Sequence, residues 1–289
     1  MKVLITGGGG QIGHALSASA PDDLTVATLS RRELNVADEH AVGSWLEAHR
    51  PDVVINAAAY TAVDRAEDEP EIAAQVNAQG PRYLAEAARR RGARLIHLST
   101  DFVFDGTSSV PYRPEASTAP LSVYGMTKRA GEQAVLDVLP TRSTIVRTAW
   151  VYAAQGRNFL RTMLRLMTLN GRVRVVADQV GSPTSAHSVA RALWWIVARP
   201  ELVGIHHWTD SGVASWYDFG VAIAEEGLAA GLLAAEVDVV PISTAQYPTR
   251  ARRPSYSVLD RSSLLDALGI VPAHWRKNLR EVIHEIGHA

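Results

Sequence analysis

The chain has 289 residues, of which 47% are hydrophobic, and its formal net charge at pH 7 is −1. That size suffices for a large core, while the near-neutral balance lacks the positive field that would hold nucleic acid or an anionic membrane surface. No cysteine occurs, which excludes disulfides, thiolate metal sites and a cysteine nucleophile. The chain starts in an apolar strand pattern without targeting features or a membrane-length apolar run, so we expect a cytoplasmic protein.

Short apolar runs alternate with longer helical patterns through the first half of the chain. Such alternation predicts parallel strands joined by crossover helices, hence an α/β protein with a doubly wound parallel sheet of the Rossmann type. The expected strands are 3–5, 24–29, 53–55, 95–98 and 144–146, and the expected helices are 38–49, 71–91 and 122–138.

The rhythm becomes less regular in the second half. We therefore expect a dinucleotide-binding domain over 1–150 and a smaller, mixed α/β substrate-binding domain over 151–289. This boundary is soft, because the segment near 188–208 also fits a return to the first sheet. The expected elements are helices at 158–169 and 188–199 and strands at 173–176 and 204–208.

A glycine-rich loop follows the first strand directly, with Gly7, Gly10 and Gly13 placed as a helix begins. Glycine lets the backbone approach a pyrophosphate, whose charge then meets free N–H groups and the positive end of the helix dipole. A flexible loop is the alternative, but the strand before it and the helix after it favour dinucleotide binding.

The end of the second expected strand indicates which dinucleotide is bound. An NAD-preferring protein usually places an acid there, yet no acid occurs before Glu33. Arg31 or Arg32 can instead pair with a 2′-phosphate through two hydrogen bonds, which favours NADPH, with NADH as an alternative. Taken alone, either arginine fits equally well as a surface residue on a solvent-exposed turn. Small residues at 56–59 leave room for a nucleoside against the third strand.

Tyr124 and Lys128 are four positions apart, so on a helix their side chains share one face. A free phenol has a pKa near 10 and is a reluctant acid–base group, whereas a neighbouring ammonium favours phenolate and brings the pKa nearer working pH. This spacing predicts a proton-donating pair. A packing tyrosine beside an exposed lysine is the alternative.

Thr100 and Asp101 follow the fourth expected strand, at the sheet edge where open α/β proteins bind ligands. We expect the Thr100 hydroxyl to bind a substrate carbonyl beside Tyr124, so that charge developing on oxygen meets two fixed donors. Asp101 either binds substrate hydroxyls or caps a turn.

The order of glycine loop, Ser-Thr-Asp and Tyr-x-x-x-Lys resembles the extended short-chain dehydrogenase/reductase superfamily. Longer strings narrow the likeness to the dTDP-4-dehydrorhamnose reductase family, and they span almost the whole chain. These strings are NAAAYTAVD at 56–64, STDFVFDG at 99–106, RTAWVY at 147–152 and DQVGSPT at 178–184.

The resemblance implies reduction of the C4 ketone of dTDP-4-dehydro-L-rhamnose to dTDP-L-rhamnose, with catalysis by Thr100, Tyr124 and Lys128. It also implies a nucleotide-sugar partner, and we expect a monomer or homodimer. The substrate contacts expected are Thr100, Asp101, Trp150 and Arg253. The cofactor contacts expected are Gly7, Gly10, Gln11, Ile12, Gly13, Arg31, Asn35, Val36, Ala58, Ala59, Tyr60, Thr61, Tyr124 and Lys128.

Three positions depart from the family pattern. The adenine-proximal pair typical of the family is replaced by Leu34-Asn35-Val36. Tyr256 stands where the family's carboxyl-terminal motif has an asparagine, which points to a changed substrate pocket. Family members that dimerise around a metal have an acid where this chain has Ala15, so we expect no metal site.

Other functions remain open on the same fold. A nucleotide-sugar 4,6-dehydratase needs a glutamate where this chain has Phe102, and a 4-epimerase retains NAD, which the absent acid after the second strand disfavours. A reductase of another dTDP-4-keto-deoxysugar, made for a natural product, fits equally well. An alternative of another class is a non-catalytic NADP-binding regulatory subunit, which intact Tyr124 and Lys128 disfavour.

Overall fold

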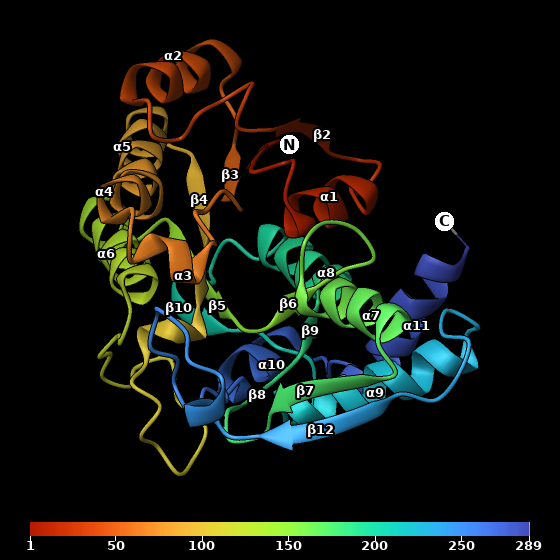
Figure 1. Ribbon diagram of the computed structural model, residues 1–289. Helices are drawn as coiled ribbons and strands as arrows, with labels where there is room; N and C mark the ends of the chain where they lie inside the picture. The colour runs from red at the N-terminus through yellow and green to blue at the C-terminus, as the bar shows by residue number, and fades with distance from the viewer. Residues whose placement is uncertain (289) are drawn as a thin grey trace.

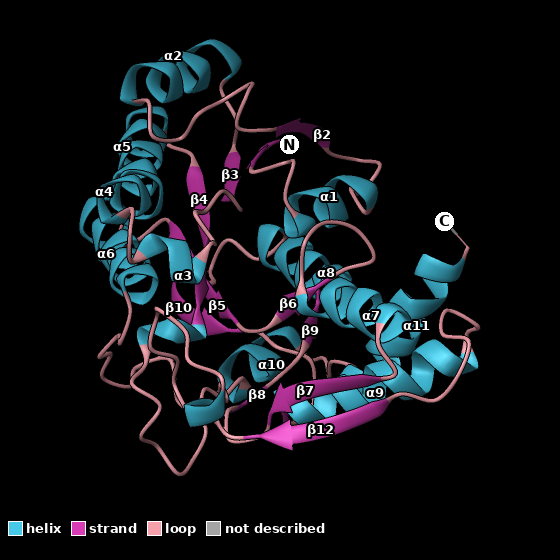
Figure 2. Ribbon diagram, viewed as in Figure 1, coloured by secondary structure: helices cyan, strands magenta, loops and turns pink. Residues whose placement is uncertain are grey.

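The structure is a computed structural model that describes residues 1–288. Its centre is a sheet of six parallel strands in the order β10-β5-β4-β3-β1-β2, seen in Figures 1 and 2. This arrangement confirms the predicted doubly wound α/β fold. The strands are β1 Lys2–Thr6, β2 Thr25–Leu29, β3 Val53–Asn56, β4 Arg94–Thr100, β5 Ser143–Thr148 and β10 Gly204–His207.

Helices cover both faces of this sheet, because side chains of successive strand residues point to opposite faces. In β1, Val3 and Ile5 pack with α1 and α8, whereas Leu4 packs with α2, α5 and α6. Figure 2 shows the two helical layers on either side of the strands. The helices are α1 Gln11–Ala18, α2 Glu39–His49, α3 Val63–Ala66, α4 Pro70–Ala74, α5 Gly80–Arg91, α6 Val123–Val138 and α8 Ala186–Val197.

Strand β10 comes from the second half of the chain and lies at one edge of the sheet. It pairs in parallel with β5, with Ile205 opposite Ile145. Helix α8 packs against α1 on the same sheet. Segments well beyond residue 150 therefore belong structurally to the first sheet, while the functional division at that residue stays a prediction.

The remaining carboxyl-terminal elements form a second apolar cluster below the main sheet in Figure 1. Its centre holds Tyr152, Phe219 and Trp275, packed between helices and three two-stranded sheets. Helix α10 instead packs with the core of the main sheet through Leu264 and Leu268. The elements are β6 Val151–Tyr152, α7 Phe159–Leu169, β7 Arg172–Val176, β8 Val180–Gly181, β9 Thr184–Ser185, β11 Ala214–Ser215, α9 Trp216–Ala229, β12 Asp238–Ile242, α10 Ser262–Leu268 and α11 Trp275–Gly287.

The helix expected at 71–91 is continuous but changes form in its middle. Helix α4 passes through a π-helical turn, Gln75–Gln79, before α5 begins. Pro81 lacks the N–H that would bond to the carbonyl of Asn77, so the ordinary α-helical bond cannot form there. The buried Asn77 side chain instead binds the Tyr60 backbone and the Thr127 hydroxyl. The turn thus ties the cleft-lining segment at Tyr60 to α6.

Helix α6 lies close to the carboxyl end of β4. Ser122 caps it by accepting the Gly125 N–H at 3.2 Å. A Cβ at Gly125 would lie 2.3 Å from the Phe102 carbonyl oxygen, and one at Gly131 would lie 2.1 Å from that of Asn77. Gly125 therefore permits the close approach that brings Tyr124 and Lys128 to the strand end, and Gly131 permits the approach of α6 to the π-helical turn.

Candidate active site

The glycine loop joins β1 to α1 in a conformation that requires glycine. Gly7 has φ +76, in the left-handed region. A Cβ at Gly13 would lie 2.3 Å from the Gly7 carbonyl oxygen. Gly10 is the N-cap of α1, where no side chain occupies the free N–H groups. The loop and the helix end therefore fit a pyrophosphate.

Two neighbouring cavities open beside this loop. The first has a volume of about 550 Å³ and lies over the ends of β2 and β3, which suits an adenosine. Gly10, Ala57 and Ala59 line both cavities, so a single dinucleotide can extend from one into the other. Predicted cofactor residues that line the first cavity are Gly7, Gly10, Arg31, Asn35, Val36, Ala58, Ala59 and Tyr60.

Arg31 and Arg32 are exposed at the rim of the first cavity. Glu33, the nearest acid in sequence, accepts hydrogen bonds from the backbone and the hydroxyl of Ser30. Its carboxylate therefore caps the turn. Two guanidiniums next to the position of an adenosine ribose fit a 2′-phosphate.

The second cavity has a volume of about 520 Å³ and lies between the carboxyl end of β4, helix α6 and the carboxyl-terminal elements. It unites polar strand-end residues with aromatic side chains from the second cluster. Predicted site residues that line it are Gly10, Gln11, Ile12, Ala59, Thr61, Thr100, Asp101, Tyr124, Lys128, Trp150 and Arg253. Gly13 lies under the loop and lines neither cavity.

Thr100, Tyr124 and Lys128 come together at this cavity. The Thr100 hydroxyl lies against the Tyr124 phenol and donates to Asp101 Oδ1 at 3.0 Å. Lys128 is 2% exposed, and its Nζ donates to the Leu98 carbonyl at 2.7 Å. This bond uses one of the three N–H donors of the ammonium and leaves two further donors.

The protonation states differ from the expectation that Lys128 brings the Tyr124 phenol nearer working pH. Desolvation raises the pKa of Tyr124 to about 12, with the Asp101 charge adding to the rise and the Thr100 hydroxyl opposing it. Burial also lowers the pKa of Lys128 to about 8, against the attraction of Glu132. The predicted lowering of the Tyr124 pKa by Lys128 does not appear in this structure, in which Tyr124 retains its proton at neutral pH. A retained proton is what a proton donor requires.

Asp101 is a buried carboxyl group, 2% exposed. Its Oδ2 has no hydrogen-bond partner, and burial raises the pKa of the carboxyl to about 6, although the nearby Ser257 and Thr100 hydroxyls oppose the rise. A buried, unpaired acceptor at a cavity wall suits a substrate hydroxyl. Substrate binding is thereby favoured over a merely structural turn cap.

Trp150 forms part of an aromatic wall. It stacks on Trp216 with ring centroids 3.5 Å apart and planes 3° apart. Its backbone is in the left-handed region, φ 50, where a bulky residue is strained. Gly181 lies directly beneath the indole, since a Cβ there would approach it to 2.6 Å. The packing therefore holds Trp150 in a conformation that its backbone does not favour.

Arg253 reaches the cavity from the carboxyl-terminal loop. Its guanidinium binds the Asp64 carboxylate with bonds of 2.7 and 3.1 Å, and this pair lowers the pKa of Asp64 although burial opposes the effect. The pair bridges the two sides of the cleft, because Asp64 belongs to α3 of the first half. The cation is held at the cavity wall, where an anionic substrate can reach it.

Sequence reasoning missed Trp216, Phe159 and Arg157, which also line the second cavity. Each lies at or near the start of a carboxyl-terminal helix, and the Ser215 capping box before Trp216 is a local signal of such a start. That signal locates a helix but gives no information about which cavity the helix faces. No group of three or more His, Cys, Asp or Glu suited to a metal occurs within residues 1–288.

Together, the doubly wound sheet, the glycine loop and the Thr–Tyr–Lys cluster define an extended short-chain dehydrogenase/reductase. The family described as RmlD substrate binding domain matches residues 1–287. The chain belongs to this family, that of the dTDP-4-dehydrorhamnose reductases.

Three comparisons give the extent of similarity. A dTDP-4-dehydrorhamnose reductase of Streptomyces griseus is 44% identical over 96% of this chain and 91% of its own. A probable dTDP-4,6-dihydroxy-2-methyloxan-3-one 4-ketoreductase of Streptomyces antibioticus is 43% identical over 99% of this chain and 96% of its own. A dTDP-4-dehydrorhamnose reductase of Bacillus anthracis, crystallised in complex with NADP, has a TM-score of 0.93 and 33% identity, covering 98% of this chain and 99% of that one.

Proposed function

We propose that the protein reduces the C4 ketone of dTDP-4-dehydro-L-rhamnose to the alcohol of dTDP-L-rhamnose, using NADPH. The observation that carries the proposal is the meeting of Thr100, Tyr124 and Lys128 in a cavity that adjoins the phosphate loop. Membership of the reductase family and the name of the Streptomyces griseus relative support the sugar.

When bound, NADPH supplies the hydride for the ketone carbon. The Tyr124 phenol would donate to the ketone oxygen. The Thr100 hydroxyl would turn from Asp101 Oδ1, its acceptor in this structure, to become the second donor. The phenol transfers its proton as charge develops on the ketone oxygen. The raised pKa of Tyr124 keeps that proton in place until the oxygen becomes basic. The Lys128 ammonium stabilises the phenolate that remains.

Residues of both cavities would hold the cofactor. The glycine loop and the α1 N-terminus fit the pyrophosphate, and Arg31 or Arg32 fits the 2′-phosphate. Gln11, Ile12 and Thr61 line the neighbouring cavity at the reacting end. NADPH binding is supported by the Bacillus anthracis relative, whose structure contains NADP.

The sugar nucleotide would lie on the other side of the second cavity. Trp150 offers an aromatic face to the apolar side of the ring, and Asp101 accepts from a hydroxyl. Arg253 suits the diphosphate. These roles follow from side-chain chemistry and from position on the cavity wall.

The proposal is tested by mixing the protein with NADPH and dTDP-4-dehydrorhamnose and following the nicotinamide absorbance. We expect consumption by the wild type and a loss of about 10²- to 10⁴-fold in kcat for Tyr124→Phe. Tyr124→Phe should keep its Tm and its affinity for NADPH. Lack of consumption by correctly folded wild-type protein would rule out this substrate.

A second candidate is the reduction of another dTDP-4-keto-deoxysugar. It is favoured by the name of the Streptomyces antibioticus relative and by Tyr256, which is partly buried near Tyr112 and packs in the cluster that contains Trp150. Tyr256 does not line the second cavity, so it can affect the sugar only through the packing of Trp150, which does. Comparing kcat/KM for both ketones distinguishes the candidates.

We also propose a cytoplasmic location and a monomeric or homodimeric state. The location is supported by the proposed substrates, because sugar nucleotides and NADPH are metabolites of the cytoplasm. Within the described residues, no helix is long and apolar enough to cross a membrane. Light scattering on the purified protein measures the oligomeric state directly.

A further inference from the structure

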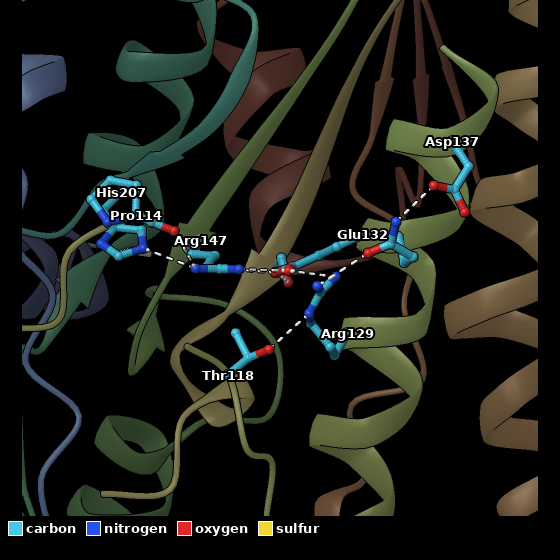
Figure 3. Close-up of polar contacts among 9 residues, drawn as sticks. Pro114, Thr118, Arg129, Glu132, Asp137, Arg147 and His207 are labelled. Carbon is cyan, nitrogen blue, oxygen red and sulfur yellow. Dashed lines mark hydrogen bonds and ion pairs between the residues drawn. The ribbon is translucent and has the colours of Figure 1, made fainter. Parts of the chain in front are cut away.

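A buried ion pair lies behind the second cavity, between α6 and β5. Glu132 is fully buried and Arg147 is 1% exposed. The guanidinium binds the carboxylate through Nε to Oε1 at 2.8 Å and Nη2 to Oε2 at 2.7 Å. Ser99, at the end of β4, donates its hydroxyl to Oε1 at 2.5 Å. Figure 3 shows Arg147 and Glu132 facing each other between these elements.

The far side of Arg147 is held as well. Its Nη1 donates to the Pro114 carbonyl at 3.1 Å, and its guanidinium lies 5.1 Å from the centre of the Phe104 ring. His207 Nε2 lies 3.5 Å from Nη1, while its Nδ1 lies 3.0 Å from the Asp260 carbonyl. Burial and the Arg147 charge lower the pKa of His207 to about 3, so the imidazole is neutral. Arg147 is therefore fixed at both ends.

The pair is connected to the catalytic residues through the end of β4. Leu98 accepts from Lys128, the next residue donates to Glu132, and Thr100 lies against Tyr124. Their partners on α6, Tyr124, Lys128 and Glu132, occur at intervals of four residues, so they share one face of the helix. Three consecutive strand residues thus meet three successive turns of the helix.

Stability alone is a weak reason for such a pair. Burying two charges removes both from water, and apolar residues of similar volume often replace a buried pair without loss. The Glu132 carboxylate lies one helical turn from Lys128, whose ammonium is itself buried. A fixed negative charge at that distance stabilises the ammonium against its loss of water.

We propose that Glu132, fixed by Arg147 and Ser99, is a positioning residue that keeps Lys128 as an ammonium and sets the end of β4 against Tyr124. The inference deepens the proposed function and rests on it for the catalytic role of Lys128. Without the carboxylate, Lys128 releases its proton more readily, and the phenolate left by proton transfer loses its stabilising charge.

Other ionisable groups surround Lys128. His97, on β4, is fully buried, and its pKa is held well below the ordinary value by burial and by the Lys128 charge, so it is neutral. Tyr124 precedes Lys128 by one turn and retains its proton. Glu132 is the charged group that raises the pKa of Lys128. Removing Glu132 should therefore change the titration of Lys128 directly.

The chain offers a direct readout, because its only lysines are Lys2, Lys128 and Lys277. In protein labelled with ¹³C at lysine Cε, NMR resolves three side chains, and Lys128→Met assigns the one of interest. We expect the wild-type Lys128 resonance to titrate with a midpoint about 8. In Glu132→Gln the midpoint should fall by about one pH unit or more, a tenfold loss of proton affinity. This titration needs neither NADPH nor sugar.

The pH profile of kcat provides the second readout. The alkaline loss of activity should begin about one pH unit lower in Glu132→Gln than in wild type. If Glu132→Gln fails to fold because Arg147 is left unpaired, the double variant Glu132→Gln/Arg147→Met removes both charges. A smaller fall in the Lys128 midpoint is then expected, because loss of the Arg147 cation acts in the opposite direction. Thr144→Val is the matched control, since it removes a buried hydrogen bond on the same strand, to Leu202. It should lower Tm without moving the midpoint.

The outcomes distinguish the inference about Glu132 from the proposed function. An unchanged Lys128 midpoint in a folded variant that lacks Glu132 overturns the inference, whatever happens to Tm. Wild-type protein that reduces neither ketone overturns the proposed function, while the NMR titration still decides whether Glu132 holds the Lys128 proton. A lower midpoint together with an acid-shifted kcat profile supports both.

Discussion

Asp101 and Tyr124 hold protons more tightly than free side chains do. Burial raises the pKa of the Asp101 carboxyl to about 6 and that of the Tyr124 phenol to about 12. For Tyr124 this is useful to a reductase, since the phenol remains an acid at neutral pH. For Asp101 it means that near pH 7 the carboxylate is charged in a buried position, where the surrounding protein stabilises the charge poorly.

Asp101→Asn should stabilise the fold at neutral pH and leave it unchanged in acid. Below about pH 4 the carboxyl is protonated in both folded and unfolded states. Between about pH 4 and pH 6 the Asp101 carboxyl is ionised in the unfolded chain but still protonated in the folded protein, so the free energy of unfolding falls as the pH rises. At pH values above 6 the loss of stability is complete and amounts to about 3 kcal/mol. Asparagine removes this cost and retains the Oδ1 acceptor for Thr100. Urea unfolding at pH 4 and pH 7.5 measures it.

Activity supplies the control for this variant. Asp101→Asn should raise KM for the sugar nucleotide, because a neutral amide accepts a substrate hydroxyl less strongly. If the gain in stability of Asp101→Asn over wild type is no larger at pH 7.5 than at pH 4, burial of this carboxyl carries no cost.

Arg31→Ala should reduce the preference for NADPH over NADH. The exposed guanidinium lies at the rim of the first cavity, where we propose that adenosine binds. Loss of a charge-assisted bond to phosphate should lower kcat/KM for NADPH about tenfold or more, with that for NADH little changed. Steady-state rates with both cofactors measure this. Arg89→Ala, an exposed arginine at the end of α5, is the control. Equal losses with both cofactors would exclude a 2′-phosphate contact.

The sequence predicts best those site residues that lie close together along the chain. Tyr124 and Lys128 belong to one helix, so their spacing predicts their common face before any tertiary contact is known. Trp216 and the Glu132–Arg147 pair depend on segments that only folding brings together, and no local pattern records such contacts. The catalytic and binding roles of the predicted residues stay predictions.

At the level of elements, sequence predicted the strands of the first half well because buried parallel strands are continuous apolar runs. The helix at 71–91 differs because Pro81 lacks one backbone donor and the chain makes a π turn around Asn77. The carboxyl-terminal two-residue strands were not expected, since two residues display no period. Among them, β8 is important for the site, because Gly181 lies beneath Trp150.

Gly181→Ala should displace the Trp150 indole, whose atoms lie 2.6–2.9 Å from the position of the new Cβ. Trp150 is already strained and stacked on Trp216, so it can move only by breaking that stack. We expect KM for the sugar nucleotide to rise about tenfold to hundredfold, with NADPH affinity unchanged. Steady-state kinetics and nicotinamide fluorescence measure the two effects.

Gly171→Ala is the matched control for this substitution. Gly171 is an exposed glycine just before β7, and an added Cβ there meets no atom within 4 Å. It should leave both constants unchanged. If Gly181→Ala has wild-type KM, the position of the Trp150 ring does not govern sugar binding.

At the level of the whole molecule, the cleft separates the sheet with its phosphate loop from the carboxyl-terminal elements. Polar contacts from distant segments cross it. Asn158 caps α7 and donates to the Gln11 side chain at 2.7 Å, which links the second cluster to the phosphate loop. Arg253 binds Asp64 on the opposite wall. The two sides of the cleft are thus held in register by contacts between distant segments.

Arg253→Met should weaken binding of the sugar nucleotide while leaving the cofactor site intact. The guanidinium faces the second cavity, and methionine keeps an unbranched apolar stem without the charge. Loss of a charge-assisted bond to a diphosphate corresponds to about 1.5–3 kcal/mol, hence a rise in KM of about tenfold to hundredfold. The Asp64 carboxylate left behind is 44% exposed, so water can solvate it and folding should be preserved.

Arg250→Met is the control for a direct contact between Arg253 and the substrate. Arg250 lies in the same loop and forms an ion pair with Asp68, as Arg253 does with Asp64. It does not line the second cavity. Loss of either pair loosens the same loop from the first half of the chain, but only Arg253 can contact a diphosphate in the cleft. A similar rise in KM for both variants would therefore mean that loop attachment, and not a direct contact from Arg253, controls substrate binding.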